Sequence, residues 1–318
     1  MTMKTTMPFL SRTSAGLLLA LWLVPVTGLP AADDSTFKDA RAAAAKGDPK
    51  AEFFLAQCYA HGKNVPWDYS KAVEYLRLAA AQGYASAQNN LGAYYMQGLG
   101  VKADAVEGVS WFRKAAAQGD RLAEYSLGQC YFQGRGVAKD ISQALEWYHQ
   151  AAAQNQPDAI GALGDIYLTG TEGIKIDYEE AFKWCQKGAT LENADSLNGL
   201  GFLYEQGVGG ATQNPDLAVK YYREAAEKGF ARAYANLGRM YELGTGLKPD
   251  PVEAYKWYQL GVRAGDRMSL RYEEAMDGDG ILSEAQRQDA NQRVAAYLTL
   301  QPAKTLDENK SGEATKPE

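Results

Sequence analysis

Three short fragments have the residue types and spacing of a serine-nucleophile hydrolase site. They are Ser35–Lys38, an S-x-x-K sequence, Ser196–Asn198, an S-x-N sequence, and Lys310–Gly312, a K-S-G sequence. In enzymes with these motifs, the serine opens a buried helix and the third fragment lies on a strand beside it. Here the first fragment follows an apolar N-terminal run, the second opens a helix of a sequence repeat, and the third lies in a polar tail. We therefore interpret the three matches as coincidental.

The stretch Asp277–Ser283 resembles the middle of a calcium-binding loop. The ligand positions before and after it would be Ala275 and Gln286, where such a loop needs an aspartate and a bidentate glutamate. Because two ligands are missing, we do not expect strong calcium binding. We expect a turn that leads into a C-terminal helix.

His61 and His149 show no spacing to cysteine or carboxylate that is typical of a metal site or a catalytic triad. The carboxylates fall at predicted helix caps and exposed helix positions, and no glycine-rich phosphate loop follows a strand. The sequence therefore predicts no catalytic residue, no metal and no cofactor.

The two histidines and Ser196–Asn198 lie in a sequence repeat of 36 or 37 residues, and such a repeat is one supersecondary unit stacked on its neighbours. Its copies begin at Ala51, Ala87, Ala123, Ala159, Ser196 and Ala233. The fifth position is always leucine and the ninth always tyrosine, so both lie on one face of a helix. The sixth is alanine in the first copy and glycine in the others. Because glycine inside a helix costs up to about 1 kcal/mol against alanine, its recurrence predicts a close helix crossing.

Each copy also contains a turn and a second helix. Glycines follow the first helix at Gly98, Gly134, Gly170, Gly207 and Gly244, as expected at a helix C-terminus. N-terminal caps of the second helix are predicted at Asp68, Asp104, Asp140, Asp177, Asn214 and Asp250. Reciprocal capping boxes are expected where Glu107, Gln143, Glu180 and Glu253 follow three residues later. The second helix carries alanines and an aromatic, and glycines end it in four copies.

The full pattern, A-x-x-x-L-G-x-x-Y-x-x-G-x-G-V-x-x-D-x-x-x-A-x-x-W-Y-x-x-A-A-x-x-G, resembles the Sel-one-like repeat, a branch of the tetratricopeptide superfamily. The match covers six copies, residues 51–268. The resemblance implies an all-α fold, an α-solenoid in which helix pairs form a right-handed superhelix. It also implies a protein-interaction role and no catalytic residue.

The three cysteines follow from the repeat. Cys58 and Cys130 occupy one repeat position two copies apart, and Cys185 replaces an aromatic. Two stacked units separate the first two thiols far beyond the Cα separation of about 7 Å that a disulfide permits. We expect all three to be buried core thiols.

Residues 1–32 have the layout of a secretory signal peptide. Lys4 and Arg12 precede an apolar run, Ala15–Val26, which small residues follow. The run is short for a membrane-spanning helix, so an uncleaved anchor is the alternative. No cysteine follows the run before Cys58, so lipid attachment is not expected. We predict a periplasmic or secreted protein with no integral membrane segment after cleavage.

Capping elements are expected on both sides of the repeats. The sequence predicts an N-terminal capping helix in residues 33–50 and a C-terminal capping helix in residues 269–300. Ser283 is the predicted N-cap residue of the second helix. Residues 301–318 are polar and charged, and we expect them to be disordered. The net charge of −6 argues against nucleic acid or an anionic membrane surface as the main partner.

The resemblance places the binding surface on the first helix of each repeat, which lines the concave groove of tetratricopeptide solenoids. Its outward positions, three, seven, ten and eleven, vary between copies. The candidate partner-binding residues are Gln57, His61, Asn89, Gln97, Tyr125, Gln129, Gln133, Asn198, Phe202 and Glu205. The same register adds Phe53, Met96, Phe132, Asp165, Thr169, Gln206, Arg239 and Glu242.

Two functional hypotheses follow. The first is a non-enzymatic scaffold whose groove binds a protein or peptide through aromatic and amide side chains. The second is a cell-envelope enzyme or a protein that binds peptidoglycan or a β-lactam, because a relative of this repeat type has been linked with penicillin recognition. The groove positions could also be an ordinary solvated face, and their aromatics could be inter-repeat packing.

Overall fold

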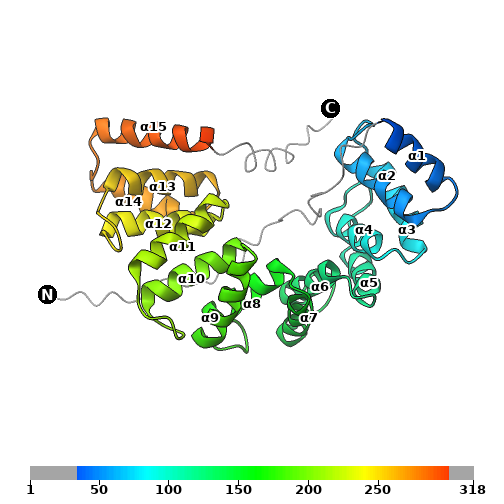
Figure 1. Cartoon of the computed structure of the whole chain (residues 1–318), viewed down its shortest axis with the longest axis horizontal. Helices are drawn as coiled ribbons and strands as arrows, with labels where there is room; N and C mark the ends of the chain where they lie inside the picture. The colour runs from blue at the N-terminus through cyan, green and yellow to red at the C-terminus, as the bar shows by residue number, and fades with distance from the viewer. Residues whose placement is uncertain (1–33, 301–318) are drawn as a thin grey trace. The chain divides into compact units, whose positions relative to one another are not determined.

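A computed structural model describes residues 34–300, which form fifteen α-helices and no β-strand (Figure 1). The predicted signal peptide and the predicted disordered tail lie outside these residues. The helices are α1 (Asp34–Ala44), α2 (Pro49–His61), α3 (Tyr69–Ala81), α4 (Ala85–Gln97), α5 (Ala105–Ala116), α6 (Arg121–Gln133), α7 (Ile141–Ala153), α8 (Pro157–Thr169), α9 (Tyr178–Thr190), α10 (Ala194–Gln206), α11 (Pro215–Glu227), α12 (Ala231–Leu243), α13 (Pro251–Arg263), α14 (Arg267–Gly278) and α15 (Glu284–Leu300).

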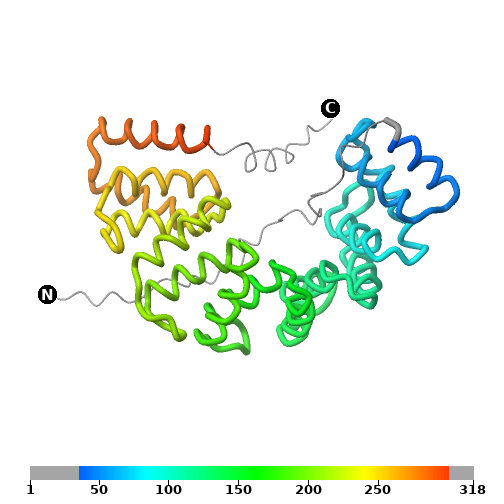
Figure 2. Tube along the Cα trace, in the orientation of Figure 1, coloured from blue at the N-terminus to red at the C-terminus, as the bar shows by residue number. Residues whose placement is uncertain are grey.

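The chain divides into two compact units at residues 159 and 160, inside the first turn of α8. In the first unit, each helix from α1 to α7 packs on the next one in the chain, as the colour sequence of Figure 2 also shows. In the second unit, the same order runs from α9 to α14, and α15 packs on α13. The predicted fold class, an all-α repeat solenoid, is confirmed.

Within a repeat, the glycine at position six lets the two helices cross closely. A Cβ added to Gly128 would lie 2.5 Å from the ring of Tyr148, and one added to Gly238 would lie 2.4 Å from that of Tyr258. Real Cβ atoms do not approach other atoms so closely, so only glycine fits over an aromatic ring. Two repeats lack this glycine–ring pair. The first has Ala56 and Leu76 at the two positions, and in the fourth a Cβ added to Gly164 would lie 3.0 Å from the Cys185 sulfur. The predicted close crossing is confirmed.

The ninth-position tyrosine fixes the turn through its backbone. Its carbonyl accepts a hydrogen bond from the N–H of the residue that caps the second helix, at 2.8–3.0 Å in all six repeats. The cap side chain then accepts from the first turn of that helix, as Asp140 does from the Gln143 N–H at 3.0 Å. The predicted caps are therefore confirmed. The reciprocal half of the capping box is wrong for Asp140, because its N–H already donates to Tyr131 and the Gln143 amide donates to Glu146 instead.

The first helix of each repeat begins two residues before the sequence alignment placed it. Asp48, Asp120 and Asn193 cap α2, α6 and α10 through their side chains. Its C-terminal glycines take the predicted left-handed conformation, with φ between 67° and 75° at Gly98, Gly134, Gly207 and Gly244.

Both ends of the described chain carry capping helices. At the N-terminal end, Phe37 of α1 packs with Leu55 and Cys58, where the capping helix is expected. At the other end, Ser283 and Gln286 form the predicted capping box in front of α15. The prediction of a single closing helix in 269–300 is wrong, because most of α14 also lies there.

The glycine–ring contact predicts unequal effects of one substitution at two equivalent sites. Gly128→Ala should lower the free energy of unfolding by about 1–3 kcal/mol, since the new methyl group collides with the Tyr148 ring. Gly164→Ala should cost less, because it meets a single sulfur atom and gains helix propensity of up to about 1 kcal/mol. Urea denaturation of both variants measures the difference. Equal losses would show that the ring does not set the helix spacing.

The cap geometry predicts a second contrast. Asp140→Ala should cost about 0.5–2 kcal/mol, because it removes the acceptor for the first turn of α7. Gln143→Ala should change stability by less than about 0.5 kcal/mol, because its side chain lies on the surface and does not return to the cap. Thermal unfolding checks both variants, and a large loss with Gln143→Ala would contradict the hydrogen bonding described above.

Candidate functional site

The sequence-predicted residues of the first unit lie on α2, α4 and α6. His61 and Gln133 are exposed, whereas Gln57, Gln97, Tyr125 and Gln129 are half-buried. Asn89 is 3% exposed, so the expectation that it faces outward is wrong.

Some of these side chains contact other parts of the repeat. The Gln129 amide donates a hydrogen bond to the Tyr125 hydroxyl, and the Tyr125 ring lies 5.8 Å from that of Tyr148. Met96 is 2% exposed and belongs to the core. The contacts of Gln129 and Tyr125 lie within one repeat, so inter-repeat packing of these residues stays a prediction.

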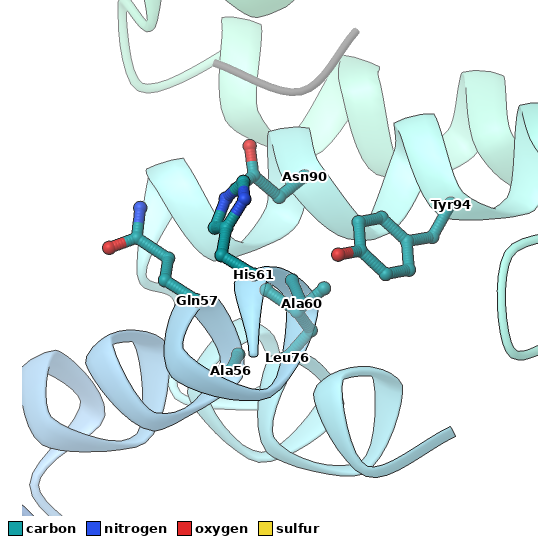
Figure 3. Close-up of a pocket in the computed structure, with 7 residues that line it drawn as sticks. All are labelled: Ala56, Gln57, Ala60, His61, Leu76, Asn90 and Tyr94. Atoms are coloured by element: carbon teal, nitrogen blue, oxygen red, sulfur yellow. The ribbon is translucent and has the colours of Figure 1, made fainter. Parts of the chain in front are cut away.

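A pocket lies between α2 and α4, the first helices of the first two repeats (Figure 3). Its seven lining residues are Ala56, Gln57, Ala60, His61, Leu76, Asn90 and Tyr94. In Figure 3, the side chains of Gln57, His61 and Asn90 gather on one side, and the Tyr94 hydroxyl points toward Ala60. The volume is about 270 Å³, including space that is open to solvent. Two predicted residues, Gln57 and His61, are thus brought together with two that the prediction omitted.

The pocket is polar at its rim and uncharged. None of the lining side chains is a carboxylate, a lysine or an arginine. Partial burial lowers the pKa of the His61 imidazole, which favours the neutral form. Burial also raises the pKa of the Tyr94 phenol, so this hydroxyl stays protonated and can donate. The pocket therefore suits an uncharged group that forms hydrogen bonds.

Helix α4 contains three buried amide atoms that have no hydrogen-bonding partner within residues 34–300. They are Oδ1 of Asn89, Oδ1 of Asn90 and Nε2 of Gln97. Asn89 and Asn90 are only 3% and 7% exposed. A buried polar atom without a partner costs roughly 1–3 kcal/mol, so native proteins rarely leave one unexplained. Among the described first helices of the repeats, no other carries more than one such atom.

The equivalent face of the second unit is already paired. The Asn236 amide donates to Asn198 at 2.8 Å, and the Arg239 guanidinium donates to Glu205 at 2.5 and 2.8 Å. Glu205 also accepts from the Tyr222 hydroxyl at 2.8 Å and is 8% exposed, so the expectation that it faces outward is wrong. Phe202 is half-buried beside Tyr178, with 6.1 Å between ring centroids.

The catalytic and metal alternatives have no assembled site in the part of the chain that the structure describes. No cluster of His, Cys, Asp or Glu there could hold a metal ion. Asp277 accepts from the Tyr255 hydroxyl and pairs with Arg287, consistent with the expected turn. Ser196 is 1% exposed and packs against Gly188, away from solvent.

The three thiols are buried and free, as predicted. Burial raises the pKa of Cys130 to about 12, and it also raises the pKa values of Cys58 and Cys185. Because the thiolate is the nucleophile, these thiols are unreactive in the folded chain.

Asn90 and Tyr94 were missed because they occupy positions four and eight, which the register assigned to packing. No clear signal was present in the sequence, because position four is apolar or small in three other copies (Phe54, Ala162 and Gly199) but polar in the remaining two (Ser126 and Asn236).

The match to a family model follows the helices. A model described as the Sel1 repeat matches residues 49–84, 85–120, 121–156, 157–193, 194–230 and 231–266. Each matched segment begins at the first residue of α2, α4, α6, α8, α10 or α12. No curated protein matches the chain.

Two solved structures resemble the chain in sequence and fold. One is a protective antigen of uropathogenic Escherichia coli with an SLR fold, 28% identical with a TM-score of 0.66. The similarity covers 82% of this chain and 56% of that protein, so this chain spans about half of its length. The other is a Sel1 repeat protein from Oxalobacter formigenes, 30% identical with a TM-score of 0.65, covering 71% of this chain and 92% of that one.

The paired face of the second unit predicts a structural role for Arg239. Arg239→Met should lower the free energy of unfolding by about 3–5 kcal/mol, because it leaves the buried Glu205 carboxylate without its cation. Arg232→Met removes a more exposed ion pair, to Asp165 at 3.2 Å, and should cost at most about 1 kcal/mol. Chemical denaturation of both variants provides the comparison. Similar small losses would show that the Glu205–Arg239 pair is not needed for folding.

Proposed function

Because the chain belongs to the Sel1 repeat family, we propose that it is a non-enzymatic scaffold that binds a segment of another protein on the first-helix face of its first unit. Proteins of this family generally act as protein-interaction scaffolds. None of the helices in residues 34–300 combines the length and apolar content that a membrane span requires.

The family match over residues 49–266 is the observation that carries this proposal, and the side chains of α2 and α4 mark the face. Asn89 and Asn90 each bury an acceptor, and Gln97 buries a donor, without a partner among the residues described. In the second unit, the asparagines at the equivalent positions three and four, Asn198 and Asn236, hydrogen-bond to each other. The first helices of the two units therefore differ, and the face that carries Gln57, His61 and Gln97 is the one we propose for binding.

The size of the pocket supports a protein segment over an enzyme substrate. Sites for whole small molecules usually enclose about 300–1,000 Å³. The pocket between α2 and α4 is much smaller, because its volume of about 270 Å³ includes open solvent and its apolar lining residues Ala56, Ala60 and Leu76 are at most 6% exposed. It therefore does not enclose a whole small molecule. No observation within residues 34–300 favours the enzyme alternative.

The proposed location is the bacterial periplasm or the cell exterior. The proposal is based on the charges Lys4 and Arg12, followed by the apolar run Ala15–Val26, which together are typical of a secretory signal. A similar protein of uropathogenic Escherichia coli is described as a protective antigen.

The binding face is tested by recovery of partners in the native host. Wild-type protein should enrich at least one envelope or exported protein. The double variant Gln57→Ala and Gln97→Ala should lose it without a fall in melting temperature, because Gln57 lies at the edge of the pocket and the Gln97 Nε2 has no partner within residues 34–300 whose loss would destabilise the fold. Gln206→Ala, which removes an exposed amide from the second unit, is the matched control and should recover the partner normally. Equal recovery with all three proteins would refute the proposed face, and co-purified glycan without protein would favour the cell-wall alternative.

A stability measurement tests the same face without a partner. Asn90→Leu should raise the free energy of unfolding by about 1 kcal/mol, because an apolar group of similar shape replaces a buried acceptor that has no donor. Urea denaturation of the isolated protein measures the change. A loss of 1 kcal/mol or more would mean that Asn90 stabilises the fold, and the argument from its unpaired oxygen would fail.

A further inference from the structure

We propose that the solvent-exposed side of α9 is a docking site for a helix of a partner protein, and that this helix carries an arginine and, four residues later, an aromatic residue. The site lies on the second helix of a repeat, so the inference goes beyond the proposed function and does not depend on it. It follows from a helix of this chain, α15, which packs on the equivalent surface of α13 (Figure 1).

Helices α9 and α13 carry the same side chains at the same spacing. From the N-cap onward, both read D-x-x-E-A-[FY]-K-W-x-Q, and α3, α5, α7 and α11 each lack at least two of the five polar and tryptophan positions. In both helices the lysine pairs with the glutamate three residues before it. The shared residues are Asp177, Glu180, Lys183, Trp184 and Gln186 on α9, and Asp250, Glu253, Lys256, Trp257 and Gln259 on α13.

On α13, this surface is occupied by α15. The Arg293 guanidinium donates to the Glu253 carboxylate at 3.0 Å and to the Asp250 carboxylate at 3.2 Å. Four residues later, the Tyr297 ring meets the Trp257 ring in a T-shaped contact, with 5.2 Å between centroids. Residues four apart lie on one face of a helix. The surface therefore recognises a cation and an aromatic ring on adjacent turns of one helix.

On α9, the same surface is open. The side chains of Lys183 and Glu180 are 66% and 38% exposed, whereas those of Lys256 and Glu253 are 11% and 15% exposed. Lys256 lies 5.5 Å from the centroid of the Tyr297 ring, so α15 covers it. The second unit thus contains one copy of the surface with a helix on it and one copy without.

The carboxylates of α9 favour an arginine. Asp250 caps α13 through Oδ1 and receives Arg293 through Oδ2. Asp177 also caps α9 through Oδ1, so its Oδ2 can accept a cation in the same way. A guanidinium has several N–H donors in a fixed plane and can bridge two carboxylates, here Asp177 and Glu180.

A helix of another protein fits α9 better than α15 of a second copy does. On α13, α15 also buries Ala290 in a cluster with Tyr255 and Met276. On α9, Phe182 stands at the position of Tyr255, and its ring already packs on Tyr204 of α10, with 5.9 Å between centroids. Transfer of α15 to α9 would therefore lose apolar burial, whereas a partner helix has no such contact to give up.

The test uses a peptide with the sequence of residues 284–300, held helical by a cross-link between the exposed positions 288 and 292. Fluorescence anisotropy measures its binding to residues 33–318, in which α15 stays on α13. Glu180→Gln should weaken binding roughly fivefold, as expected for the loss of one partly exposed ion pair. Glu179→Gln makes the same charge change at an adjacent exposed position of α9 and should leave the affinity unchanged.

Substitutions in the peptide test the two recognition elements separately. Tyr297→Ala in the peptide should weaken binding about tenfold, because the contact with the Trp184 ring is lost. Arg293→Glu in the peptide should abolish binding to the wild type. The variant Glu180→Lys should recover part of the binding of this second peptide, since the charges of the pair are then exchanged.

Four results would overturn the inference. The first is no binding of the peptide, and the second is equal weakening by Glu179→Gln and Glu180→Gln, which indicates unspecific charge attraction. Weakening by Glu253→Gln but not by Glu180→Gln would place the peptide on α13, in exchange with α15. Dimers of the wild type that Glu180→Gln dissociates in sedimentation velocity would assign α9 to α15 of a second copy. None of these results changes the test of the first-unit face, which uses Gln57 and Gln97.

Discussion

The contact between a glycine and an aromatic ring sets the spacing of the two helices in four of the repeats. A Cβ at position six would lie 2.4–2.7 Å from the ring in the pairs Gly92–Phe112, Gly128–Tyr148, Gly201–Tyr222 and Gly238–Tyr258. The leucine at position five is at most 2% exposed in all six repeats, because this close crossing removes it from water. The glycine costs helix propensity, but the buried leucine and ring outweigh that cost. The constant spacing lets neighbouring repeats stack with the same contacts.

On this constant scaffold, the exposed side of the first helix differs between the two units. In the second unit, the buried Glu205 carboxylate accepts hydrogen bonds from Arg239 and Tyr222, which stabilise it in the core. In the first unit, Oδ1 of Asn89, Oδ1 of Asn90 and Nε2 of Gln97 lack partners among the described residues. The same helical position can therefore stabilise the fold in one repeat and remain open for recognition in another. Family membership alone does not distinguish these cases, because the repeat pattern leaves these positions variable.

The sequence predicted most of the fold because its signals are local and repeated. The caps, the C-terminal glycines, the buried leucines and the close crossing each follow from a residue whose backbone or packing requirement is specific. Helix α14 was not predicted because it has Glu273, Glu274 and Asp277 at the positions where the repeat has leucine, glycine and tyrosine. Packing against α13 and α12 stabilises it instead. The site was predicted only in part. Helical register identifies a face, but whether Asn89 is buried or Glu205 is paired depends on side chains from neighbouring helices, which no single repeat encodes.

Because of the three buried thiols, the lifetime of the native protein in an oxidising solution depends on its unfolding rate. Cys58, Cys130 and Cys185 are inert in the native chain because burial raises their pKa values. An unfolded chain exposes all three at the ordinary thiol pKa of about 8.5, where oxidants and other thiols can react with them. In an oxidising solution, each excursion to the unfolded state thus risks a covalent trap that prevents return to the fold. The lifetime of this protein under such conditions is set by a kinetic barrier rather than by an equilibrium.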